Sequence, residues 1–124
     1  MLGVKEPKRV YIKESRGNLE QRQIARMIRH LRNQYHDRNP QQSMPSDWLL
    51  EQLVINGAKQ CVLAKKSWEI KIRSTLKEII LDTSYPDCQY INNHNYMPLF
   101  PNSEFYEPWE VHHAMKSLLS FLDG

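Results

Sequence analysis

The residues with the clearest chemical use are a row of arginines in the first third of the chain. Arg22, Arg26 and Arg29 are spaced by three and four residues, and the row continues in either Arg32 or Asn33. On a helix this spacing places the guanidinium groups on one face, where they can bind phosphate oxygens. The candidate anion- or nucleic-acid-binding residues are Arg16, Arg22, Arg26, Arg29 and Arg32.

The charge of the surrounding segment supports this interpretation. Residues 1–40 hold ten Lys or Arg and four acidic residues, whereas residues 41–124 hold seven Lys or Arg and ten acidic residues. A basic first segment and an acidic remainder predict two different surfaces. The alternative is a solvated helix face, but this needs acidic partners three or four residues away, and few are available.

The histidines and cysteines are weaker candidates for a site. Glu110 and His113 have the Glu-x-x-His spacing of a metal-binding helix, but the sequence offers no second helix of that type. We expect His112 to pack in the core and His113 to face solvent. Cys88 and His94 are only two ligands, fewer than the four of a structural zinc site, so no metal site is expected.

No catalytic residues can be assigned from the sequence. Two-metal nucleotidyl transfer needs carboxylates that share metal ions, and the sequence contains no Asp-x-Asp or Glu-x-Asp pair. It also lacks a glycine-rich phosphate-binding loop and a nucleophile elbow. We therefore expect a protein that is not an enzyme by itself and that binds no cofactor.

The composition is that of a folded domain. The chain has 124 residues, of which 40% are hydrophobic, 10% aromatic and 25% charged. No apolar run approaches the roughly 20 residues needed to span a bilayer, so no membrane association is expected. The two cysteines, Cys61 and Cys88, cannot form a disulfide framework, which favours an intracellular location, nuclear or cytoplasmic.

We predict a mostly α-helical fold with four to five helices in one domain, over residues 18–124. Residues 1–17 are expected to be a tail with at most one short strand, formed where Val10 and Ile12 alternate with polar residues.

Capping residues indicate where the helices begin. Asn18, Ser46 and Ser67 each precede a stretch with helical spacing, and Pro108 suits the first position of the last helix. The expected helical segments are 19–36, 47–55, 58–65, 68–82 and a last helix from residue 108.

The second helix is apolar on most sides and is expected to lie at the centre of the core. The residues predicted to form this core are Trp48, Leu50 and Leu53 with Ile28, Leu31 and Leu76; Trp68 and Trp109 are expected on the buried faces of their helices.

Residues 84–106 are expected to form a long irregular loop, because asparagines and prolines alternate there with aromatic residues. A loop of this length in a compact domain is uncommon and is usually functional or wrapped over the surface. The aromatic residues favour wrapping. The candidate contacts for a partner protein are Tyr90, Tyr96, Phe100, Phe105 and Tyr106.

The order of these segments resembles the helical half of template-independent nucleotidyltransferases of the oligoadenylate-synthetase type. The resemblance lies in Arg26-Met-Ile-Arg-His-Leu-Arg32 and, after a polar gap, in Met44-Pro-Ser-Asp-Trp-Leu-Leu-Glu-Gln-Leu-Val54. In that family a basic helix with the pattern Ile-Arg-x-Leu-Arg is followed by a proline-led helix with a Leu-Glu-x-Leu core.

The chain is more similar to DZF domains, the catalytically inert relatives found in double-stranded-RNA-associated nuclear factors. There the two helices are followed by a helix like residues 72–80, a loop like Pro86-Asp87-Cys88 and a final helix like residues 114–122. The resemblance covers about residues 22–90 and, loosely, 109–123. It does not include the catalytic half of the enzymes, whose Gly-Ser turn and paired aspartates are missing from these residues.

The resemblance and the arginine row together predict a non-catalytic protein-interaction module, a pseudoenzyme in an RNA-associated complex. The expected partner is another protein or a second copy of the chain, because in DZF proteins the helical half makes the dimer; RNA is the second expected partner. One alternative is a domain that binds nucleic acid directly through its basic first helix. Another is the helical part or subunit of a nucleotidyltransferase, completed by a partner chain.

Overall fold

The computed structural model describes residues 17–100 and 107–124, and in these parts the chain forms four α-helices. They are α2 (Leu19–Arg38), α3 (Asp47–Ala58), α4 (Trp68–Asp82) and α5 (Pro108–Leu122). The predicted mostly α-helical fold is thereby confirmed. Extended backbone pairs at one isolated antiparallel bridge in the described residues, between Ile91 and Pro98. None of the four helices is both long and apolar enough to cross a membrane.

The helices begin at the predicted capping residues. The side chain of Asn18 accepts a hydrogen bond from the backbone of Gln21, whose own side chain accepts from the backbone of Asn18. The hydroxyl oxygens of Ser46 and Ser67 cap α3 and α4 by accepting from the backbone N–H groups of Leu49 and Ile70. Pro108 is the first residue of α5, where its missing N–H costs nothing. Local side chains therefore set the start of each helix.

α3 lies at the centre of the core, as predicted from its apolar sequence. Leu50 and Leu53 are at most 1% exposed. α3 runs antiparallel to α2, because Asp47 at its start is paired with Arg32, near the end of α2, while Ile55 near its end contacts Gly17, which precedes α2.

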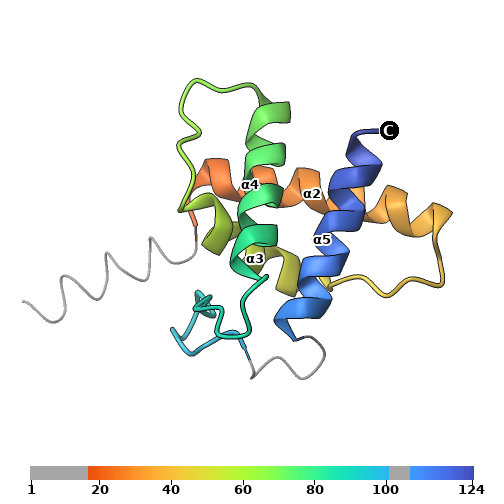
Figure 1. Ribbon diagram of the computed structural model, residues 1–124. Helices are drawn as coiled ribbons and strands as arrows, with labels where there is room; N and C mark the ends of the chain where they lie inside the picture. The colour runs from red at the N-terminus through yellow and green to blue at the C-terminus, as the bar shows by residue number, and fades with distance from the viewer. Residues whose placement is uncertain (1–16, 101–106) are drawn as a thin grey trace, which may run out of the picture.

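α4 and α5 stand side by side and antiparallel, and α2 crosses behind both (Figure 1). At one end of the pair, Arg73 of α4 forms an ion pair with Asp123, just after α5. At the other end, Nδ1 of His112 donates a hydrogen bond to the carbonyl oxygen of Ile80 over 2.7 Å. His112 is half-buried and joins the two helices through this bond.

α3 and α4 approach each other closely at Gly57. A Cβ atom on this residue would lie 2.6 Å from Cγ1 of Ile79, closer than carbon atoms can pack. The glycine therefore lets the two helices cross at this point, although glycine inside a helix is entropically unfavourable.

The prediction of a further helical segment at residues 58–65 is wrong. α3 ends at Ala58, and the amide groups of Gln60 and Cys61 bond to carbonyl oxygens three residues back, so the chain turns. Lys65 has a positive φ of 64°, which no helix residue adopts. Leu63 is buried and draws this turn against the core. The predicted strand at residues 10–12 lies outside the described residues.

The three tryptophans were predicted to be buried, and this is wrong. Trp48, Trp68 and Trp109 are 46%, 39% and 63% exposed. Each lies in the first turn of its helix, where the chain enters from solvent. The core uses smaller side chains from the same helices, among them Leu49 and Val111.

Candidate functional site

Three of the predicted arginines form one face of α2, called here the arginine face: Arg22, Arg26 and Arg29. Arg22 and Arg26 are exposed and Arg29 is half-buried. The opposite side of α2 is anchored by Ile24 and Ile28, which are 0% exposed. Because a helix rises about 1.5 Å per residue, the face extends about 10 Å along its axis.

Arg32, the fourth predicted member, does not belong to this face. Its side chain is 13% exposed and forms an ion pair with Asp47 at the start of α3. Its Nη1 also donates to the carbonyl oxygen of Pro45 over 2.9 Å, and its Nη2 donates to the side chain of Asn33 over 2.7 Å. Arg32 therefore joins α2 to α3 and is not available to an anion, which corrects its assignment. Arg16 lies outside the described residues.

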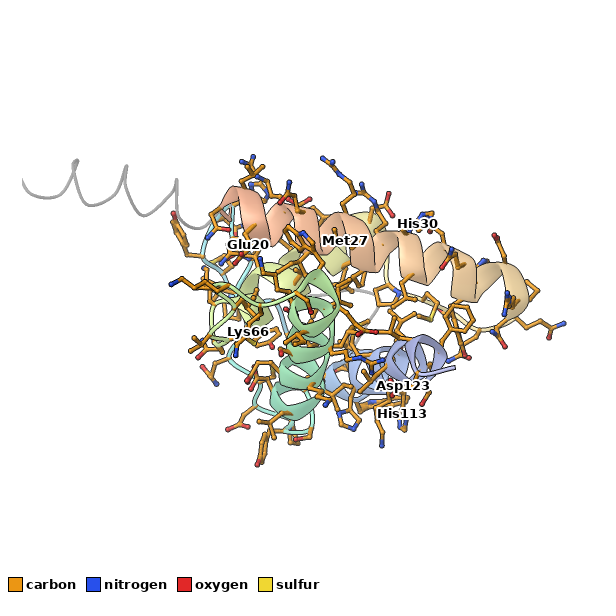
Figure 2. The ribbon with its side chains drawn as sticks, turned by 90° about the horizontal axis from the view of Figure 1, so that it is seen from above. Glu20, Met27, His30, Lys66, His113 and Asp123 are labelled. Carbon is orange, nitrogen blue, oxygen red and sulfur yellow. The ribbon has the colours of Figure 1, made fainter. Side chains whose placement is uncertain are left out.

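The arginine face is not neutralised within the described parts of the chain, since no acidic group there lies within ion-pairing distance of its three guanidinium groups. The nearest acid in the sequence, Glu20, points elsewhere. Figure 2 shows Glu20 and Met27 on the side of α2 that faces α4, where Glu20 pairs with Nζ of Lys71 over 2.8 Å. The face therefore presents a line of positive charge to solvent.

Two of the five aromatic residues predicted to contact a partner protein are buried within this chain. Tyr90 and Phe100 are each 6% exposed and pack in the core of this chain, so their rings are not available to another protein. Tyr96 is half-buried and has a positive φ of 62°. Phe105 and Tyr106 lie outside the described residues. Among the described residues, the exposed large apolar side chains are Leu19, Trp48, Val62, Trp68, Ile70, Leu81, Tyr85, Met97 and Trp109.

Two polar side chains of α3 hold the loop in place, and the sequence analysis missed both. The amide of Asn56 bonds to the N–H and the C=O of Ile91, over 3.0 and 2.8 Å. Oε1 of Gln52 accepts from the backbone and side-chain nitrogens of Asn93, over 2.7 and 3.0 Å. The signal that could have revealed them was their spacing of four residues, which places two amides on one side of a helix that is apolar on most sides.

A second anchor of the loop is a carboxyl pair on α4. Tyr90 donates its hydroxyl hydrogen to Oδ2 of Asp82 over 2.7 Å, at the edge of a surface cavity of about 490 Å³. Glu78, one turn earlier on α4, hydrogen-bonds to Asp82. This hydrogen bond, then burial and the charge of Asp82, raise the pKa of Glu78 to about 7. Glu78 therefore keeps its proton below neutral pH.

The original protein should lose stability as the pH rises from about 4.5 to 7. We expect the Glu78→Gln variant to lose less stability over the same range. The folded state holds its Glu78 proton up to about pH 7, whereas the unfolded state releases it near 4.5. Folding therefore takes up a proton in this window, and stability falls as the pH rises through it. Glutamine keeps a neutral donor, so the variant should be more stable than the original protein at pH 8.

Urea denaturation between pH 4.5 and 8 measures this effect, and Glu51→Gln on α3 is the matched change outside the pair. A Glu78→Gln variant with the pH profile of the original protein would show that the pKa of Glu78 is not raised by folding.

The cysteines and histidines do not form a reactive or metal-binding centre in the described residues. Burial, followed by nearby carboxylates, raises the pKa of the Cys61 thiol, and burial is also the main cause of the raised pKa of Cys88. Both thiols are therefore protonated and poor nucleophiles at neutral pH. Within residues 17–100 and 107–124, no three His, Cys, Asp or Glu side chains gather as metal ligands would.

Comparison with known proteins gives no match to a protein family, to a curated protein or to a solved structure. The resemblance to DZF domains and nucleotidyltransferases therefore stays a prediction from the sequence.

Proposed function

We propose that this chain is a non-catalytic interaction module of an RNA-associated complex, and that its arginine face contacts the RNA backbone. The observation that supports this most is the separation of roles within the arginine row. Arg32 is used by the fold, whereas Arg22 and Arg26 are exposed and have no ionic partner in the described residues. Guanidinium groups in a line suit the phosphates of a nucleic-acid strand, which recur about every 3.4 Å of duplex axis.

The resemblance to DZF domains is the second support, because those domains occur in RNA-associated factors. A protein partner is also part of the proposal. Its contact would use exposed apolar side chains such as Leu81, Tyr85 and Trp109, which are 55%, 57% and 63% exposed, and not the buried rings of the loop.

Reversing two charges of the arginine face should weaken RNA binding. Arg22→Glu with Arg26→Glu should reduce the affinity for a labelled RNA oligonucleotide by about 10- to 100-fold, because two phosphate contacts become repulsive. The slope of log affinity against log salt should fall by about one for each arginine lost. Fluorescence anisotropy over a range of salt concentrations measures both quantities.

The matched control is Lys77→Glu with Lys116→Glu, two exposed lysines on α4 and α5. This pair changes the net charge by the same amount but lies outside the arginine face. Equal losses of affinity in both double variants would mean that only net charge matters, and the proposed site would then be rejected. Circular dichroism should be the same for all three proteins, because none of the four side chains is buried.

A further inference from the structure

The side of α2 that carries the arginine face leads to a cavity near the end of the helix. Asn33 and His36 follow Arg29 by four and seven residues, so all three lie on one side of α2. Asn33 and His36 also line a surface cavity of about 450 Å³. The line of positive charge and the cavity therefore belong to one continuous surface of the same helix.

The loop of residues 39–46 leaves the end of α2 and leads back to the start of α3 (Figure 1). The cavity lies between this loop and the last two turns of α2. Its lining includes Arg32, Asn33, His36 and Asp37 from the helix and Met44 and Pro45 from the loop. Pro45 is buried and Met44 packs against the core, so one wall is apolar. A cavity of this volume that combines an apolar wall with a few polar groups is typical of sites for small ligands.

The amide group of Asn33 is held in a fixed orientation at this cavity. Its Oδ1 accepts hydrogen bonds from Nε and Nη2 of Arg32, over 3.1 and 2.7 Å. Arg32 is itself held by Asp47 and by the carbonyl oxygen of Pro45. The amide nitrogen of Asn33 has no acceptor among the described residues. Asn33 therefore offers a preoriented hydrogen-bond donor to a ligand.

The charges around the cavity favour a neutral group over a phosphate. The guanidinium of Arg32 is neutralised by Asp47, whereas no cation in the described parts of the chain lies within ion-pairing distance of Asp37. A phosphate inside the cavity would therefore meet an uncompensated carboxylate. The same carboxylate can accept hydrogen bonds from N–H groups, and the exposed imidazole of His36 is a ring on which a base can stack.

A nucleobase has the complementary features, because it has a flat ring and an edge that both donates and accepts hydrogen bonds. Resting on the proposed function, we propose that the cavity takes one unpaired base of the RNA strand whose phosphates lie on the arginine face. Asn33 donates to the edge of this base, Asp37 accepts from it, and His36 stacks on its ring. The base is unpaired, because pairing in a duplex would engage the same edge.

The test compares a labelled single-stranded RNA decamer with an abasic strand of the same length, which keeps the sugars and phosphates but has no bases. Asn33→Asp keeps an acceptor for Arg32 and removes the donor. Gln34→Glu is the matched control, because it makes the same charge change at an exposed neighbour that is not among the lining residues. Asn33→Asp should weaken binding of the decamer about 10-fold more than Gln34→Glu, whereas both variants should bind the abasic strand equally.

The stacking contact is tested separately at His36. His36→Ala should weaken binding of the decamer about 10-fold, the usual effect of losing one stacked base, and should not change binding of the abasic strand. His36→Phe should restore the affinity for the decamer, because phenylalanine keeps a ring for the base. Equal weakening of both strands by Asn33→Asp or by His36→Ala would overturn the base site.

A second measurement uses the unaltered protein and so does not depend on how a substitution affects folding. In amide NMR spectra, nucleoside monophosphates at millimolar concentration should shift the side-chain signals of Asn33 and the backbone signal of Met44. Ribose 5-phosphate, which has no base, should not. No shift with any of the four nucleotides would overturn the base site. If Arg22→Glu with Arg26→Glu still weakened RNA binding in that case, the proposed function would stand, whereas no binding of the decamer would reject both.

Discussion

Leu53→Ala should lower the free energy of unfolding by about 2–5 kcal/mol, the range found for truncating a fully buried leucine. Leu53 is 0% exposed and belongs to the central cluster of apolar side chains to which all four helices contribute. Removing its isobutyl group leaves a cavity that α2 and α4 cannot close without moving relative to α3. Urea denaturation at constant pH gives the change in free energy, with an unchanged slope if the unfolded state stays the same.

Val62→Ala is the control for this prediction, because Val62 is 86% exposed in the turn before α4. This substitution also removes methyl groups, but from a side chain that water already surrounds. It should therefore change the free energy of unfolding by less than about 0.5 kcal/mol. A Leu53→Ala protein as stable as Val62→Ala would mean that the buried face of α3 is assigned incorrectly.

The helices were predictable because their signals are local. Asn18, Ser46 and Ser67 cap the helices that follow them, and each cap acts within three residues of its own position. The central place of α3 was equally clear, since a helix that is apolar on most sides cannot face water.

The tryptophans and Arg32 were not predictable, because their places depend on tertiary contacts. A helical pattern gives the direction of the apolar face, but it does not say whether the first turn extends beyond the neighbouring helix. Trp68 is exposed for this reason. Arg32 fits the spacing of the arginine row, yet α3 brings Asp47 against it from fifteen residues away. No rule of spacing within one helix contains that information.

The loop of residues 84–106 was predicted to wrap on the surface. Its buried part is held by two polar residues of α3, and nothing in the sequence indicated that they belong together with the loop. Polar residues inside an apolar helix indicate a buried partner, because an unpaired amide in the core is costly. Gln52 and Asn56 meet this description, at 0% and 8% exposure. The sequence could have shown that they need partners, but not that the partners lie 35 to 41 residues further along the chain.

Asn56→Ala should destabilise the loop by about 2–4 kcal/mol. The substitution removes the donor and acceptor that satisfy both backbone groups of Ile91. The N–H of Ile91 is then left without a partner, its carbonyl oxygen keeps only a long contact of 3.5 Å with Nδ2 of Asn93, and each group that loses its partner costs about 1–3 kcal/mol. The loss should begin locally, so that the amide hydrogens of Ile91 and Asn93 exchange faster while those of α2 keep their protection.

Hydrogen exchange followed by mass spectrometry separates this local loosening from global unfolding. Gln60→Ala is the matched control, because it removes an exposed amide one turn beyond Asn56. It should leave exchange in the loop unchanged. If Asn56→Ala left the exchange at Ile91 at its original rate, the buried rings of Tyr90 and Phe100 would suffice to hold the loop. Uniformly faster exchange in all four helices would instead show that the loop and the helical core unfold as one cooperative unit, with Asn56 acting on both.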